Sequence, residues 1–121
     1  MARTGLPSHQ TQCRNRRCQI GPPLLVERLT EVADKAPRDA TLVIFHSAVL
    51  TYLEEDRRRA FIDQVLSLRA TWISNEGIGV VSSGEQVKAV SHDNNPIPFV
   101  LARDGVPMAY VRAHGQTLQW L

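Results

Sequence analysis

The chain has 121 residues, of which 43% are hydrophobic and 21% charged, and its formal net charge is +2. These values fit one globular domain, and without a run of eighteen apolar residues they exclude a membrane-spanning helix. Residues 1–23 hold four arginines and no acid, whereas the rest carries ten basic and twelve acidic residues. A mildly acidic remainder gives no reason to expect nucleic-acid binding. The start lacks the apolar segment of a secretory signal, so we expect a cytoplasmic location.

Residues 1–23 are expected to form a basic, disordered tail, because they lack hydrophobic periodicity and end at Gly21-Pro22-Pro23. Residues 24–121 are then one partial α/β domain. Cys13 and Cys18 have no second cysteine pair and no nearby histidine pair to complete a zinc site. We interpret them as incidental thiols, and an oxidation-sensitive pair activated by the neighbouring arginines is the alternative.

The next segments alternate between helix and strand. Apolar residues near 3.6-residue spacing predict a helix over 24–36, which Pro37 ends. Four consecutive large apolar residues predict a strand over Thr41–Phe45 that is buried on both faces, as in a parallel sheet covered by helices. A helical turn over 48–53, an amphipathic helix from Glu54 to Leu68 and a second strand over Ala70–Ser74 follow.

The last third of the chain has an antiparallel pattern. Segments 99–103 and 107–112 flank Asp104-Gly105, which is a strong signal for a type I′ hairpin, and 117–121 is a final strand. We interpret His92, Asp93 and His114 as loop residues, because no third metal ligand has suitable spacing. The fold class predicted is α/β: a partial three-layer, Rossmann-like sheet with two parallel strands and a C-terminal antiparallel meander.

Polar residues follow both predicted parallel strands and form the candidate site. His46 and Ser47 follow the first strand, and Asn75 and Glu76 follow the second. Since the carboxyl ends of parallel strands meet at one sheet edge, these four side chains are expected to converge. His46 would be a general base oriented by Glu76, while Ser47 and Asn75 would bind a substrate. The alternative is structural: Ser47 caps a helix and Asn75-Glu76-Gly77 is an ordinary turn.

Two resemblances extend this interpretation. The strand that ends near His46-Ser47, with the amphipathic helix after it, resembles the fourth strand and following helix of class I S-adenosylmethionine-dependent methyltransferases. The chain has no counterpart to the glycine-rich turn and the acidic residue that hold the cofactor in that family. We therefore expect no cofactor and no metal for this chain alone, with S-adenosylmethionine reserved for a full-length relative.

The second resemblance is to the domain of unknown function 2332, an uncharacterised family that we associate with actinobacteria. It is carried by four segments and covers about residues 22–121: Leu42–Leu50, Trp72–Gly77, Phe99–Ala102 and His114–Leu121. Members of this family are much longer, so the resemblance implies a C-terminal fragment or a truncated reading frame.

The expected function follows from both resemblances. The chain is predicted to be a fragment of a methyltransferase-like domain without independent catalysis. Its apolar edge at Val43, Ile44 and Phe45 would pair with another chain, which predicts self-association. Two alternatives stay open. One is a small enzyme that uses His46 and Glu76 for methyl transfer or hydrolysis, and the other is a binding module whose basic tail recruits an acidic partner.

Overall fold

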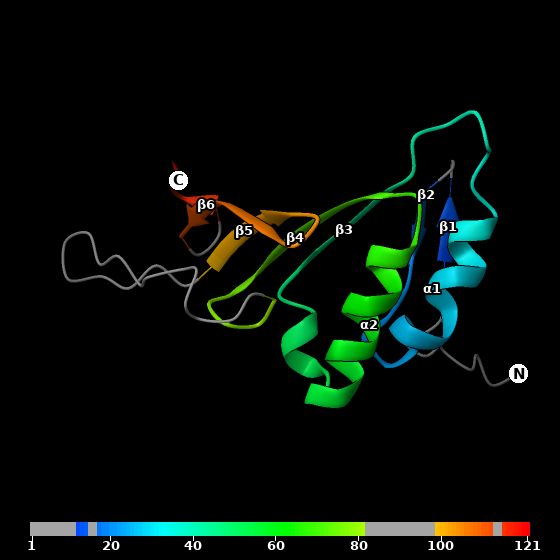
Figure 1. Cartoon of the computed structure of the whole chain (residues 1–121), viewed down its shortest axis with the longest axis horizontal. Coiled ribbons are helices and arrows are strands. Elements are labelled where there is room, and N and C mark those ends of the chain that lie inside the picture. Colours follow the sequence, from blue (N-terminus) through cyan, green and yellow to red (C-terminus); the bar gives the residue numbers. More distant parts are fainter. Residues whose placement is uncertain (1–11, 15–16, 82–98, 113–114) are drawn as a thin grey trace, which may run out of the picture.

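The computed structural model describes residues 12–14, 17–81, 99–112 and 115–121. Figure 1 shows how the elements of these segments are arranged. In chain order they are β1 (Gln12–Arg14), β2 (Arg17–Gln19), the 3-10 helix η1 (Pro22–Leu24), α1 (Leu25–Asp34), β3 (Val43–Ser47), the 3-10 helix η2 (Leu50–Tyr52), α2 (Glu55–Ser67), β4 (Thr71–Gly77), β5 (Phe99–Arg103), β6 (Val106–Val111) and β7 (Leu118–Trp120).

The main sheet has five strands in the order β3-β4-β5-β6-β7. Strands β3 and β4 are parallel, and every later neighbour is antiparallel. This confirms the mixed α/β fold with two parallel strands and a C-terminal antiparallel meander. The predicted hairpin is also confirmed, because Asp104 and Gly105 have φ angles of 50° and 81° between β5 and β6, as a type I′ turn requires.

The core lies between the two α-helices and one face of β3 and β4. Leu25 and Leu29 of α1 and Phe61 and Val65 of α2 pack in one cluster with Trp72 of β4. Figure 1 shows both helices beside the β3–β4 half of the sheet, while β5 and β6 extend away from them. The described helices therefore cover one face of the parallel pair, and they position the polar residues at its carboxyl end.

Burial of β3 on both faces, as predicted, is wrong. Val43 is 49% exposed and Phe45 is 61% exposed, whereas Ile44 between them packs against the core. The reason is the position of β3 at the end of the strand order, with the described helices on one side only. A run of apolar residues thus marks a strand correctly and still overstates how much of it is covered.

Both parallel strands run further than predicted. β3 extends to Ser47 and β4 to Gly77, so the four candidate site residues lie inside the strands instead of in the turns after them. The backbones of β3 and β4 remain paired up to Ala48, whose N–H donates to the carbonyl of Asn75 at 3.0 Å. The interpretation of Asn75-Glu76-Gly77 as an ordinary turn is therefore wrong.

Part of the predicted tail is structured. β1 and β2 form an antiparallel pair in which Cys13 lies opposite Cys18, and Cys18 is disulfide-bonded. The prediction of an incidental thiol is therefore wrong for Cys18. The division of the chain at residue 23 stays a prediction. Predictions for His92, Asp93 and His114 fall outside the described residues. Within the described segments, no helix has the length and apolar character needed to cross a membrane.

Candidate functional site

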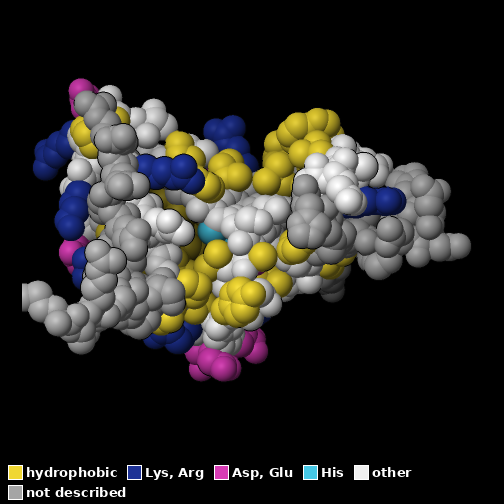
Figure 2. Space-filling model, turned by 180° about the vertical axis from the view of Figure 1, so that it is seen from behind, with side chains coloured by type: hydrophobic (Ala, Val, Ile, Leu, Met, Phe, Trp, Pro, Cys, Tyr) yellow, Lys and Arg dark blue, Asp and Glu magenta, His cyan; other side chains and the backbone are white. Residues whose placement is uncertain are grey.

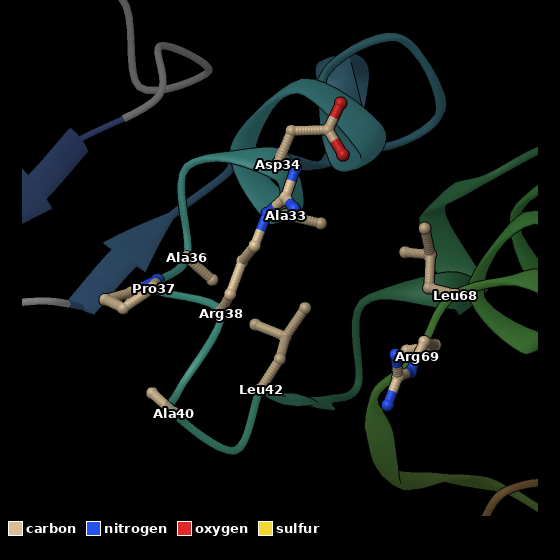
Figure 3. Close-up of a pocket in the computed structure, with 9 residues that line it drawn as sticks. All are labelled: Ala33, Asp34, Ala36, Pro37, Arg38, Ala40, Leu42, Leu68 and Arg69. Atoms are coloured by element: carbon tan, nitrogen blue, oxygen red, sulfur yellow. The ribbon is translucent and has the colours of Figure 1, made fainter.

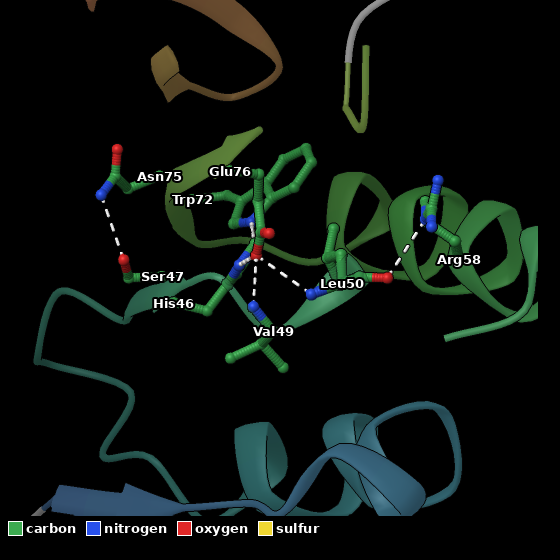
Figure 4. A network of polar contacts seen from close by, with 8 residues as sticks. All are labelled: His46, Ser47, Val49, Leu50, Arg58, Trp72, Asn75 and Glu76. Atoms are coloured by element: carbon green, nitrogen blue, oxygen red, sulfur yellow. Dashed lines mark hydrogen bonds and ion pairs between the residues drawn. The ribbon is translucent and has the colours of Figure 1, made fainter. Parts of the chain in front are cut away.

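The four predicted site residues lie at one end of the sheet but on its two different faces. Parallel pairing places Ser47 opposite Asn75 and His46 opposite Ser74, so the ends of β3 and β4 are level. Successive strand side chains alternate between faces. His46 and Glu76 therefore point toward the helices, while Ser47 and Asn75 point to the other face. The expected single cluster is wrong: the structure contains two separate pairs, which Figure 4 shows side by side.

His46 is the centre of a buried chain of hydrogen bonds. Its Nδ1 lies 2.7 Å from Oε1 of Glu76, and its Nε2 lies 2.9 Å from the indole Nε1 of Trp72. The imidazole ring also stacks on Trp72 and meets Phe61 edge-on, with centroid separations of 5.9 and 5.5 Å. The side chains of His46 and Glu76 are only 7% and 1% exposed. Both ring nitrogens therefore have partners away from solvent (Figure 4).

These partners fix the protonation of His46. An indole nitrogen can donate a hydrogen bond and cannot accept one, so Nε2 of His46 must be the acceptor. The ring proton is then on Nδ1, which donates to the carboxylate of Glu76. A second proton on Nε2 would face the N–H of Trp72. The two hydrogen bonds thereby select the Nδ1–H tautomer of the imidazole.

Glu76, although distant in the sequence, also caps the N-terminus of the short helix η2. Its Oε1 accepts the backbone N–H groups of Val49 and Leu50 at 2.9 and 3.0 Å. Burial on its own raises the pKa of this carboxyl, but the hydrogen bonds from His46, Leu50 and Val49 outweigh that effect and leave the pKa lowered. One buried carboxylate oxygen thus ties β4 both to β3 and to the segment that follows β3.

The turn between β3 and η2 is sharp. Ala48 has φ of 52°, a left-handed conformation that is unfavourable for any residue with a Cβ. Arg58 of α2 also holds η2, because its guanidinium donates to the carbonyl of Leu50, the first residue of η2, and to that of Leu53, which follows it. A strand that ends in a left-handed residue before a helix is the geometry that presents a nucleophile in α/β-hydrolases. Here that position is an alanine, so the turn presents no reactive group.

Ser47 and Asn75 form the second pair. Nδ2 of Asn75 donates to Oγ of Ser47 at 3.0 Å, and Ser47 is exposed. Because Ser47 faces away from His46, the two residues cannot form a nucleophile–base dyad in this arrangement. The pair can offer a hydroxyl and an amide to a polar ligand, which keeps substrate binding by Ser47 and Asn75 a prediction.

Trp72 is the residue of this network that the sequence did not assign to the site. Trp72 is 1% exposed within the core. Its donor role has one visible signal in the sequence: Trp72, Ser74 and Glu76 alternate along a single strand. Two polar residues on the same face as a buried tryptophan indicate a buried polar network, because polar groups in a core need partners.

A pocket of about 370 Å³ lies at the opposite end of β3 and β4. Leu42 and Leu68 contribute apolar surface to it, and Asp34, Arg38 and Arg69 are at its walls. Figure 3 shows that the two arginine side chains extend in different directions instead of converging. None of the predicted site residues lines this pocket. In the segments that the structure describes, no group of three histidine, cysteine or acidic side chains could hold a metal ion.

Comparison with known proteins identifies the family. A family model described as "Uncharacterized protein conserved in bacteria (DUF2332)" matches residues 11–120. The match covers nearly the whole chain and begins earlier than the expected residue 22. No curated protein and no solved structure matches the chain. The chain therefore belongs to the bacterial family of uncharacterised proteins DUF2332.

Proposed function

We propose that this chain is a non-catalytic part of a methyltransferase-like α/β domain, in which His46 and Glu76 hold the sheet together. The main support for this proposal is that both ring nitrogens of His46 are hydrogen-bonded, one to Trp72 and the other to Glu76. In a serine-hydrolase triad the carboxylate likewise binds Nδ1, but Nε2 faces the nucleophile. In this protein the indole N–H of Trp72 occupies the nucleophile's place. His46 consequently has no free nitrogen with which to take a proton from a substrate.

The methyltransferase-like part of the proposal is supported by the order of the elements. A parallel pair, β3 and β4, is joined through helix α2 and followed by antiparallel strands. The exposed apolar side chains of Val43 and Phe45 on the edge strand favour a larger sheet in which β3 is an interior strand. We propose on this basis that the chain is a fragment of such a domain and binds no S-adenosylmethionine alone.

Two measurements test the proposal. Isothermal titration of S-adenosylmethionine into the full chain is expected to show no binding, and a dissociation constant in the micromolar range would contradict it. Hydrolysis of p-nitrophenyl acetate tests the enzyme alternative. Wild type, His46→Ala and Ser47→Ala should all match the rate in buffer, after circular dichroism has verified that each variant is folded. A wild-type rate above buffer that His46→Ala abolishes would refute the non-catalytic assignment.

A further inference from the structure

The outer edge of β3 presents backbone N–H and C=O groups that point away from β4. Thr71 N–H donates to the carbonyl of Leu42 at 2.9 Å, and Ala48 N–H donates to that of Asn75 at 3.0 Å. Backbone direction alternates along a strand, so the even-numbered residues from Leu42 to Ala48 bond to β4. The N–H and C=O groups of Val43, Phe45 and Ser47 therefore face outward. In the described part of the chain, no hydrogen bond from another segment reaches them.

The same residues also have exposed side chains. Val43 and Phe45 are 49% and 61% exposed, and hydrophobic side chains are exposed at several places on the face in Figure 2. No charged residue lies between Thr41 and Leu53. Exposed edge strands of natural proteins usually carry charges or prolines that prevent pairing with another strand. β3 itself carries neither, which points to a strand as its binding partner.

We propose that in this chain on its own, without the larger sheet proposed above, this edge binds β3 of a second copy, antiparallel, about a two-fold axis at Phe45. Phe45 is the middle residue of β3 and has outward backbone groups, so the axis passes through a hydrogen-bonded pair. Val43 of each copy then pairs with Ser47 of the other. The two Phe45 rings lie on the same face of the joined sheet, as a cross-strand aromatic pair. The strand is thus self-complementary in both its backbone and its side chains.

One neighbouring charge makes the pairing sensitive to salt. The guanidinium of Arg17 lies over the Phe45 ring, 5.4 Å from its centroid. A two-fold axis at Phe45 brings the Arg17 residues of both copies close to each other, and like charges repel. Salt screens exposed charges beyond about 8–10 Å. Raising the ionic strength should therefore tighten the dimer a few-fold.

Sedimentation equilibrium of the full chain over a concentration series tests the proposal. The expected result is a monomer–dimer equilibrium between 13.5 kDa and about twice that mass. Phe45→Lys places a charge on the axis and should abolish the dimer. The matched control is Tyr52→Lys on η2, since Tyr52 is 76% exposed and outside β3, and it should dimerise like wild type.

A pair of proline variants tests the backbone directions. Val43→Pro removes an outward N–H and spares the bonds to β4, so the variant should stay folded and become monomeric. Ile44→Pro removes an N–H directed at β4 and should lose native circular dichroism. The proposal is overturned by a wild-type chain that remains monomeric up to about 1 mM, by a folded Val43→Pro variant that still dimerises, or by open-ended assembly, which would place a different edge in the contact.

Discussion

Replacing Glu76 by leucine should strongly lower the stability of the folded chain, because it removes the acceptor at the centre of this site. The carboxylate oxygen of Glu76 accepts three hydrogen bonds, from Nδ1 of His46 and from the backbone N–H groups of Val49 and Leu50. Leucine has a similar size and accepts none. His46 cannot avoid an unpaired Nδ1–H by moving its proton to Nε2, because Trp72 already donates to Nε2. Each buried donor left unpaired costs about 1–3 kcal/mol.

The net loss in the free energy of unfolding for Glu76→Leu is smaller than the sum of these costs. Removing a buried carboxylate also removes its desolvation penalty, and leucine gains apolar burial. We expect a loss of about 3 kcal/mol, which is a large share of the roughly 5–15 kcal/mol that stabilises a typical domain. Glu76→Gln keeps an acceptor oxygen without the charge, and because hydrogen bonds to charged groups are stronger, it should cost about 1–2 kcal/mol.

Urea unfolding followed by far-ultraviolet circular dichroism at pH 7 measures both losses. Glu31→Gln is the control, because Glu31 is half-exposed in ion pairs with Arg28 and Lys35, and such surface pairs contribute less than about 1 kcal/mol. A Glu76→Leu variant as stable as the control would refute the structural role of Glu76.

The stability difference between wild type and these variants should depend on pH. Burial raises the pKa of Glu76, but the hydrogen bonds from His46, Leu50 and Val49 lower it below the ordinary value of a glutamate carboxyl, about 4.5, in the folded state. Well above pH 4.5 the carboxyl is therefore ionised in both folded and unfolded chains, and its contribution to stability is complete. As pH falls below 4.5 toward the folded-state pKa, the contribution is lost. The stability advantage of wild type over Glu76→Gln should shrink in that window, and an advantage that grows on acidification would contradict this assignment.

Three further predictions concern the surroundings of this network. Trp72→Phe leaves Nε2 of His46 without a donor and should cost about 1–3 kcal/mol in urea unfolding, whereas an unchanged midpoint would exclude the hydrogen bond. Ala48→Gly relieves a residue with φ of 52° and should raise the melting temperature slightly, with a gain of about 0.5 kcal/mol; a lower melting temperature would show that the turn is not strained. Gly105→Ala, at φ of 81° with Trp72 only in ordinary contact, should cost about 1–2 kcal/mol of backbone strain, and a neutral effect would contradict the turn geometry.

The sequence predicted the elements better than their environment. Local signals were sufficient for the helix that packs Leu25 and Leu29 and for the hairpin at Asp104-Gly105, because spacing and turn chemistry act over a few residues. Burial of β3 depends on what lies beside it, and no local pattern gives that. The apolar run that contains Val43 and Phe45 is typical of an interior strand, and only the structure shows that β4 is the one described strand beside β3.

The candidate site was predicted in position but not in arrangement. His46 and Glu76 do meet, because they end two adjacent parallel strands. The sequence pattern groups Ser47 with them because it predicts Ser47 in a turn, where side-chain direction is free. In the structure β3 continues through Ser47, and strand alternation sends that side chain to the opposite face. A two-residue error in a strand end was therefore enough to merge two separate pairs into one predicted site.

Nitrogen NMR of His46 tests the central claim most directly, because it identifies which ring nitrogen carries the proton. Long-range proton–nitrogen correlation at neutral pH, assigned by comparison with His46→Ala, should show a single neutral form with the proton on Nδ1. In Trp72→Phe, which keeps Glu76 but removes the donor to Nε2, the Nε2 signal should shift. A wild-type ring protonated on Nε2, or on both nitrogens, would contradict the account, because His46 would then not be locked between Trp72 and Glu76.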